Sequence, residues 1–306
     1  MASTRGGADP LVIAVSINGE RTKSDNPNTP RTPDEITAAA LSCYRAGASI
    51  IHAHATAMGV KGAEAAQAYL AAWRPVKAHK PDAAWYPTLT NQGGQELEHV
   101  RLIDEAVGLE FACVDPGATP VARLDESGLP TGRYYENSFE QIRSAFAQLR
   151  EMRLGAQIAI YEPHYLRTVL AYHRAGRLPA GSVVNFYFGG WDCGPGGTGT
   201  LSFGLPPTPA ALQAYLDLLG DADLPWTVSC WGGDLLATEL PRMAIEMGGH
   251  VQVGLESHFD PVRKPTNEAQ IRHVAAMAAE AGRPLADCRA TLEVWRAPKA
   301  RASKST

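Results

Sequence analysis

Short apolar segments alternate with longer amphipathic segments along nearly the whole chain. The apolar segments are almost continuous in branched and aromatic residues, as in 11–17 (LVIAVSI) and 182–188 (SVVNFYF). Such segments are typical of parallel strands that are buried on both faces of a sheet. We therefore predict eight strands, at residues 11–17, 49–55, 83–89, 110–115, 156–162, 182–188, 225–231 and 250–256.

The amphipathic segments between these strands carry residues that start or stop helices. Thr32 precedes Pro33 and Glu35, which together make a capping box with proline at the first helical position, and Gly47 can end that helix. We expect Asn267 to be the N-cap of the last helix. The predicted helices cover residues 32–48, 63–79, 95–107, 137–152, 164–176, 208–220, 235–249 and 266–282.

Eight strand–helix units favour a (β/α)8 TIM barrel over an open doubly wound sheet. We expect a single barrel domain over residues 11–295, between a flexible N-terminus at 1–10 and a flexible basic tail at 296–306. In such barrels the active site lies at the C-terminal ends of the strands. Polar residues at those ends are therefore the candidates for function.

Composition narrows the class of protein. The 306 residues are 45% hydrophobic and 20% charged, as in a soluble globular protein, and the net charge of -4 gives no reason to expect nucleic acid as a partner. No apolar run approaches the roughly 20 residues of a membrane span, and the first residues lack a secretory apolar region. The five cysteines have no CxxC spacing, so we expect reduced thiols in the cytoplasm.

Two histidines, His52 and His54, lie within the second predicted strand. Alternate residues of a strand share a face, so both imidazoles point the same way, with Cα atoms about 6–7 Å apart. Glu256 ends the eighth strand, which is close to the second in a closed barrel. Two histidines and one carboxylate with an open position are typical of catalytic zinc and of non-haem Fe(II). The alternative is one histidine in the core and the other on the surface.

Other polar residues gather at the same predicted rim. Asn18 and Glu20 follow the first strand, Thr88 and Thr90 follow the third, and Asp115 ends the fourth. Carboxylates, imidazoles and hydroxyls at one rim indicate an enzyme or a polar binding site. The remaining rim candidates are Asn91, Glu162, His164, Asp192, Asp234 and His258.

Several motifs, taken in order, resemble the β-keto acid cleavage enzymes, whose founding member is 3-keto-5-aminohexanoate cleavage enzyme. They are NGERTKSDNPNTPRTPDEI, AGASIIHAHA, YYENSFEQI, GRLPAGSVVNFYFG and GGHVQVGLE. The resemblance covers most of the chain. It implies a zinc-bearing (β/α)8 barrel that assembles as a homo-oligomer, a dimer or tetramer. It further implies His52, His54 and Glu256 as metal ligands and Glu20 as a substrate-recognition residue.

The reaction that this resemblance implies is a condensation followed by a retro-Claisen cleavage. The enolate of a β-keto acid attacks acetyl-CoA, and the freed CoA thiolate then cleaves the adduct into acetoacetate and a new acyl-CoA. A metal ion that holds the keto acid's oxygens stabilises the developing enolate. The expected ligands are therefore a small β-keto acid, a CoA ester and Zn²⁺ or another divalent ion.

The chain departs from the family pattern around its acid–base residues. Gln252 replaces an arginine, Ser257 replaces the aspartate after the metal-binding glutamate, and Leu89 falls where the family has serine. Serine is no base at neutral pH without its own activator. Three hypotheses remain open: His258, with Asp260, supplies a substitute base; the reaction is a metal-assisted hydrolysis; or the protein binds a carboxylate ligand without turnover.

A long glycine-rich segment, 189–204, follows the sixth predicted strand. It lacks the signature of a P-loop, but at this rim it could accept the phosphates or pantetheine of CoA, with Gly196 and Gly197 as the contacts. The alternative is a flexible rim loop. The candidate catalytic residues are Glu256, Ser257 and His258; the candidate substrate-binding residues are Asn18, Glu20, Thr88, Thr90 and Gln252.

Overall fold

All eight predicted strands are present and form one parallel sheet that curls into a barrel. The computed structural model describes residues 9–55, 59–90, 97–190, 193–194, 197–198, 200–260 and 262–296. The sheet order is β3-β2-β1-β13-β12-β8-β7-β4, and a hydrogen bond from Cys113 Sγ to the Pro87 carbonyl, 3.4 Å, links the two outer strands. The strands are β1 Ile13–Ser16, β2 Ile50–Ala53, β3 Trp85–Pro87, β4 Phe111–Val114, β7 Gly155–Ile160, β8 Val183–Gly189, β12 Trp226–Trp231 and β13 His250–Val253.

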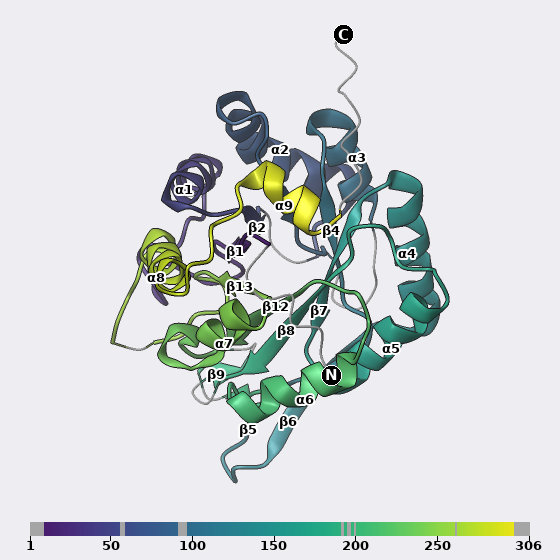
Figure 1. Cartoon of the computed structure of the whole chain (residues 1–306), viewed down its shortest axis with the longest axis vertical. Coiled ribbons are helices and arrows are strands. Elements are labelled where there is room, and N and C mark those ends of the chain that lie inside the picture. Colours follow the sequence, from purple (N-terminus) through teal and green to yellow (C-terminus); the bar gives the residue numbers. More distant parts are fainter. Residues whose placement is uncertain are drawn as a thin grey trace.

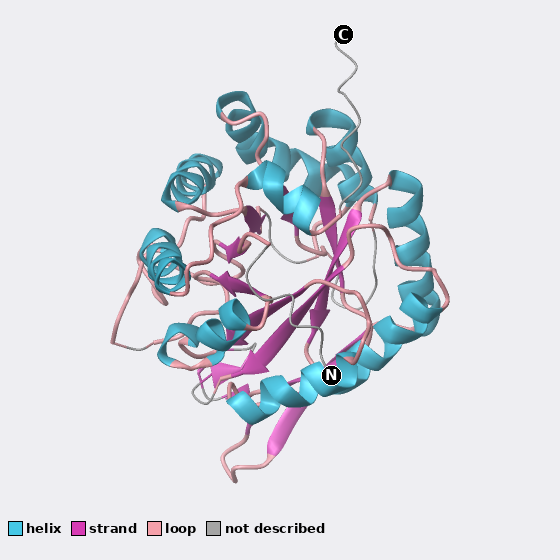
Figure 2. Cartoon of the chain, in the orientation of Figure 1, coloured by secondary structure: helices cyan, strands magenta, loops and turns pink. Residues whose placement is uncertain are grey.

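Helices form a ring outside the strands (Figure 2). The predicted capping box at Thr32 and Glu35 is confirmed, and Gly47 ends that helix with a left-handed φ of 110°. The prediction for Asn267 was wrong: Thr266 is the N-cap, because its hydroxyl accepts from the Ala269 N–H. The helices are α1 Pro33–Ala46, α2 Gly62–His79, α3 Glu98–Val107, α4 Phe139–Met152, α5 Pro163–Arg174, α6 Pro209–Leu219, α7 Leu240–Glu246, α8 Asn267–Glu280 and α9 Cys288–Val294, with a 3₁₀ turn at Leu235–Ala237.

The two larger hydrophobic clusters of the described residues hold the barrel together. The larger lies between the outer face of the sheet and the ring of helices. The smaller fills the inside of the barrel at the N-terminal ends of the strands, where Val12, Ile50 and Phe111 meet Trp295 at the end of α9. In Figure 1, α9 lies across this end of the strands. The interior is therefore closed at the N-terminal end, and only the opposite end is left for a site.

A small antiparallel sheet, which the hydrophobic pattern did not predict, extends from the loop after β4. Its strands are β5 Ala118–Leu124, β6 Pro130–Glu136 and β11 Thr200–Leu201, and Figure 1 shows the β5–β6 hairpin projecting from the barrel. Most of its side chains are exposed or half-buried, so no apolar alternation marks it in the sequence. The remaining short strands are β9 Cys193–Gly194 and β10 Gly197–Thr198.

Among the described residues, no helix combines the length and apolar character that a membrane crossing requires. The predicted flexible ends, at 1–10 and 296–306, fall almost wholly outside the described residues.

Candidate metal centre and active-site cavity

His52, His54 and Glu256 come together at the C-terminal end of the barrel, as the residue pattern predicted. His52 lies on β2, His54 follows it by two residues on the same face, and Glu256 lies just after β13. Glu256 Oε2 is 3.4 Å from His52 Nε2, and Glu256 Oε1 is 3.1 Å from His54 Nε2. One donor atom from each residue can be chosen so that all lie within 4.8 Å of one another. All three side chains are buried.

The His52 ring is oriented by β3. Its Nδ1 lies 3.3 Å from the Tyr86 carbonyl oxygen, and its ring stacks on the Tyr86 ring with centroids 4.7 Å apart. Donation from Nδ1–H to that carbonyl leaves the Nε2 lone pair facing Glu256, which is the arrangement of a metal-binding histidine. Burial lowers the pKa of His52 to about 4 despite the attraction of Glu256, so the imidazole is neutral near pH 7.

Glu256 remains ionised beside the two rings. Burial alone raises its pKa, but the neighbouring His52 and His54 rings, together with a hydrogen bond from Ser16, outweigh burial and lower the pKa to about 2. Glu256 Oε2 and both ring nitrogens of His54 are buried and have no hydrogen-bond partner among the described residues. Buried polar atoms without partners are costly, and a divalent cation would satisfy them. Two imidazoles and one carboxylate therefore fit Zn²⁺ or a related divalent ion.

Asn18, a candidate for substrate binding, lies behind the metal trio. Its side-chain amide donates to the His54 carbonyl at 2.7 Å and accepts from the His54 N–H at 2.9 Å. A second donation, at 3.1 Å, reaches the Pro30 carbonyl. The structure therefore uses Asn18 to fix the backbone of His54. On the other side, Arg21 Nε donates to the Glu256 carbonyl at 3.1 Å.

Gly19 gives a direct test of this packing. It has a φ of +54°, and an added Cβ would lie 2.4 Å from Glu256 Cγ. We expect Gly19→Ala to displace the Glu256 carboxylate and to weaken divalent-metal affinity by about 10–100-fold. Gly176→Ala is the matched control, because Gly176 has a φ of +61° and no atom within 4 Å of the added Cβ. Metal titration of both variants checks this, and equal affinities would contradict it.

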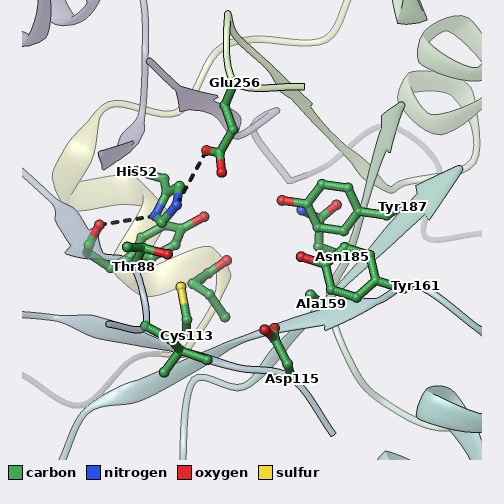
Figure 3. Close-up of a pocket in the computed structure, with 12 residues that line it drawn as sticks. His52, Thr88, Cys113, Asp115, Ala159, Tyr161, Asn185, Tyr187 and Glu256 are labelled. Atoms are coloured by element: carbon green, nitrogen blue, oxygen red, sulfur yellow. Dashed lines mark hydrogen bonds and ion pairs between the residues drawn. The ribbon is translucent and has the colours of Figure 1, made fainter. Parts of the chain in front are cut away.

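A cavity opens beside the trio at the C-terminal ends of the strands (Figure 3). It encloses about 430 Å³, its open mouth included, which is within the range of small-molecule sites. Its wall combines tyrosines, amides and two carboxylates. The lining residues are His52, Tyr86, Thr88, Leu89, Cys113, Asp115, Gln157, Ala159, Tyr161, Asn185, Tyr187 and Glu256.

Asp115 is the second carboxylate of this cavity. It comes directly after β4, and Figure 3 shows its side chain on the side of the cavity opposite Glu256. The Tyr135 hydroxyl, from β6, donates to Asp115 Oδ2 at 2.7 Å. Burial raises the pKa of Asp115 to about 6; Glu256 also raises it, and the hydrogen bond from Tyr135 opposes the rise. Asp115 therefore titrates close to neutral pH.

Gln252 lies behind the cavity wall and connects three strands. Its Oε1 accepts from Asn185 Nδ2 at 2.6 Å, and its Nε2 donates to Ser16 Oγ at 2.8 Å and to the Tyr187 hydroxyl at 2.7 Å. Because the Tyr187 hydroxyl accepts this bond, its own proton remains available for another acceptor. Gln252 thus orients a tyrosine that lines the cavity.

The other candidate site residues are spread around the rim. Thr88 lines the cavity, whereas Thr90 and Ser257 are buried outside its lining and Glu20 is exposed. His258 lines a separate pocket with Asp234, which lies 3.7 Å from its Nδ1. The candidate CoA contacts are not placed: Gly196 lies outside the described residues, and Gly197 is described only as backbone of β10.

Sequence reasoning missed much of the cavity wall, although a signal for it was present. Gln157, Ala159 and Tyr161 alternate along β7 and its end, and Asn185 and Tyr187 alternate on β8. Alternate residues share one face of a strand, so polar residues at this spacing in an otherwise apolar strand mark the barrel interior. Tyr135 carries no such signal, because its strand belongs to the small sheet.

Comparison with known proteins places this geometry in context. A family model described as beta-keto acid cleavage enzyme matches residues 10–294. The chain is 24% identical over 289 residues to 3-oxoadipate:acetyl-CoA acetyltransferase of Cupriavidus necator, covering 90% of this chain and 91% of that protein. It is 25% identical over 284 residues to 3-keto-5-aminohexanoate cleavage enzyme of Acetoanaerobium sticklandii, covering 90% and 94%.

Solved structures support the fold. The binary complex of ObcA with oxaloacetate superposes with a TM-score of 0.61 at 14% identity, covering 89% of this chain and 68% of that one. An octameric ribulose-1,5-bisphosphate carboxylase/oxygenase from Pyrococcus horikoshii superposes with a TM-score of 0.52 at 10% identity, covering 94% and 63%. At these identities the likeness concerns the fold alone, and it confirms the barrel.

Proposed function

The chain belongs to the beta-keto acid cleavage enzyme family, and from this premise we propose that it uses a bound divalent ion, Zn²⁺ in the first instance, to cleave a β-keto acid with acetyl-CoA. The products are acetoacetate and a new acyl-CoA. Its relatives carry the names of an acetyl-CoA-dependent acetyltransferase and of a keto acid cleavage enzyme. The single observation that carries the proposal is the cluster of His52, His54 and Glu256, of which His52 and Glu256 line the cavity.

His52, His54 and Glu256 would hold the ion, and their unpartnered buried atoms fit that role. When bound, the ion supplies a Lewis acid for the ketone and carboxylate oxygens of the keto acid. His54 is held by the Asn18 side chain, His52 by the Tyr86 carbonyl and Glu256 by the Ser16 carbonyl, so the donor atoms are positioned in advance. Such preorganisation favours charge that develops on the substrate oxygens.

The rest of the cavity wall orients the substrate. Tyr187 has a hydroxyl proton available because Gln252 already donates to its oxygen. A hydroxyl in this position can donate to a ketone or carboxylate oxygen of the keto acid. Leu89 and the rings of Tyr86 and Tyr161 cover the other parts of the wall. They limit the access of water to the enolate, which water would otherwise protonate.

Turnover measurements on the purified protein test the proposed function. We expect about one equivalent of divalent metal per chain, and conversion of at least one member of a β-keto acid panel into acetoacetate and acyl-CoA only when acetyl-CoA is present. Removal of the metal with a chelator should reduce the rate by about 10²-fold or more, since a Lewis acid contributes several kcal/mol. Restoring Zn²⁺ should restore the rate.

Two outcomes would contradict this function and select one of the alternatives. Product formation that is independent of CoA indicates metal-assisted hydrolysis of a C–C or C–N bond. Stabilisation of the fold by a keto acid, without turnover in the presence of acetyl-CoA, indicates a carboxylate-binding protein. Mass spectrometry of the acyl-CoA products and thermal unfolding with each keto acid separate these cases.

A further inference from the structure

We propose that Asp115 is the group that takes the proton from the α-carbon of the β-keto acid, with Tyr135 as its positioning residue. The inference rests on the proposed function and assigns its missing base. Ser257, next to Glu256, has no basic side chain, and it lies outside the cavity lining. A retro-Claisen enzyme still needs a group that can accept a proton from carbon.

Asp115 lies in the same cavity as His52 and Glu256. Among the described residues that line the cavity, the carboxylates are Asp115 and Glu256. Glu256 lies against both imidazoles, so its oxygens face the metal site. Figure 3 shows Asp115 on the opposite side of the same cavity, below Tyr161. A keto acid held at the metal trio would therefore have its carbon chain between the two carboxylates.

Asp115 is held at two points, its carboxylate and its backbone carbonyl. The Tyr135 hydroxyl donates to Asp115 Oδ2 at 2.7 Å, and Asn137 Nδ2 donates to the Asp115 carbonyl at 2.9 Å. Both partners come from the end of the β5–β6 hairpin, which has no part in the barrel sheet. The hairpin thus fixes a carboxylate at the mouth of the barrel, as a positioned base requires.

Protonation supports the same role. Burial raises the pKa of Asp115 to about 6, so this carboxyl is mostly ionised at pH 7 and is a stronger base than an exposed aspartate. Among the described residues that line the cavity there is no lysine or arginine. Besides Tyr135 and Glu256, the ionisable groups that face Asp115 are Tyr86, Cys113, Tyr161, Tyr165 and Tyr187.

Asp115 takes up one proton and returns one proton in each reaction cycle. Its carboxylate takes a proton from the carbon between the ketone and the carboxylate, and the C–H electron pair becomes the enolate. That carbon bonds to the acetyl carbonyl of acetyl-CoA, and CoA thiolate leaves. The thiolate then attacks the original ketone carbon, and the bond from that carbon to the former α-carbon breaks. The new acyl-CoA forms, and protonated Asp115 returns its proton to the carbanion of acetoacetate.

Isotope exchange isolates the first step. The wild type, incubated with the keto acid in D2O without acetyl-CoA, should exchange the α-protons faster than the uncatalysed background, as seen by NMR. We expect Asp115→Asn to retain its metal and to bind the keto acid within about threefold of wild type. The same variant should lose exchange and turnover by about 10²–10⁴-fold, the range of general acid–base catalysis. Glu126→Gln, an exposed change at the hairpin turn, is the control and should match wild type.

Tyr135→Phe tests the positioning role with a pH profile. The Tyr135 hydrogen bond stabilises the ionised form of Asp115, so its loss should raise the pKa of that carboxyl further. The acidic limb of the kcat/KM profile, where activity falls as Asp115 is protonated, should then move to higher pH. A purely structural role for Tyr135 would lower activity at every pH and leave the limb in place.

The outcomes separate this inference from the proposed function. Wild-type exchange rates in Asp115→Asn would overturn the role of Asp115, as would a variant that raises KM with kcat unchanged, since Asp115 would then be a binding group. If the wild type exchanges α-protons but never forms acyl-CoA, the proposed function fails while the exchange assay still tests Asp115. A wild type that neither exchanges nor turns over any keto acid overturns both.

Discussion

Glu256→Gln should leave the protein without its divalent ion and reduce kcat/KM by about 10³-fold or more. The amide keeps the size of the side chain but removes the negative charge that faces His52 and His54 at 3.4 and 3.1 Å. A neutral amide is a poor ligand for Zn²⁺, and loss of a Lewis acid removes several kcal/mol of stabilisation from a developing enolate. Metal analysis of the purified variant and steady-state kinetics with added Zn²⁺ measure the two effects.

Glu64→Gln is the matched control for this prediction. Glu64 lies exposed in the first turn of α2, so the same chemical change there should leave both metal content and rate unaltered. Circular dichroism of both variants establishes that the barrel has folded. A Glu256→Gln protein that retains one equivalent of tightly bound metal would show that the carboxylate is not a ligand.

The clustering of His52, His54 and Glu256 could be predicted because short-range geometry determines most of it. His52 and His54 are two residues apart in a strand, and a strand allows only one relative orientation for such a pair. Glu256 could be added because barrel closure brings the first, second and eighth strands together, and β1 pairs with both β2 and β13. Local periodicity and a known topology were therefore sufficient for this part of the site.

The contact between Asp115 and Tyr135 could not be predicted in the same way. Asp115 appeared at the predicted rim, but the role proposed for it depends on Tyr135, whose strand is exposed and has no apolar periodicity. Pairing within the β5–β6 hairpin sets the position of that hydroxyl, and this pairing depends on turn geometry far more than on burial. In the sequence, Gln252 was noted only because the resembled family has arginine at that position. The three-dimensional contacts show that Gln252 donates to the Tyr187 hydroxyl and so orients it.

The two ends of the barrel differ in the side chains that fill them. At the C-terminal end, Glu256 is buried and Asp115 is half-buried, an arrangement of two carboxylates that stability alone would not select. The N-terminal end must then supply stability that the site does not. There the interior is apolar, and α9 with Trp295 closes it. Substitutions at the two ends should therefore separate catalysis from folding.

Trp295→Ala should lower the free energy of unfolding by about 3–5 kcal/mol, the usual cost of removing a buried tryptophan from a core. The Trp295 ring is fully buried and meets Phe111 edge-on, with ring centroids 5.7 Å apart. Its Nε1 has no hydrogen-bond partner among the described residues, so the loss is one of packing and burial.

Urea denaturation measures the change in the free energy of unfolding. The control is Leu129→Ala, whose side chain is 63% exposed and whose loss should cost less than about 0.5 kcal/mol. Trp295 lies at the opposite end of the barrel from His52, His54 and Glu256. The kcat per folded molecule should therefore stay near wild type at low temperature. A Trp295→Ala protein as stable as wild type would mean that α9 does not close the barrel in solution.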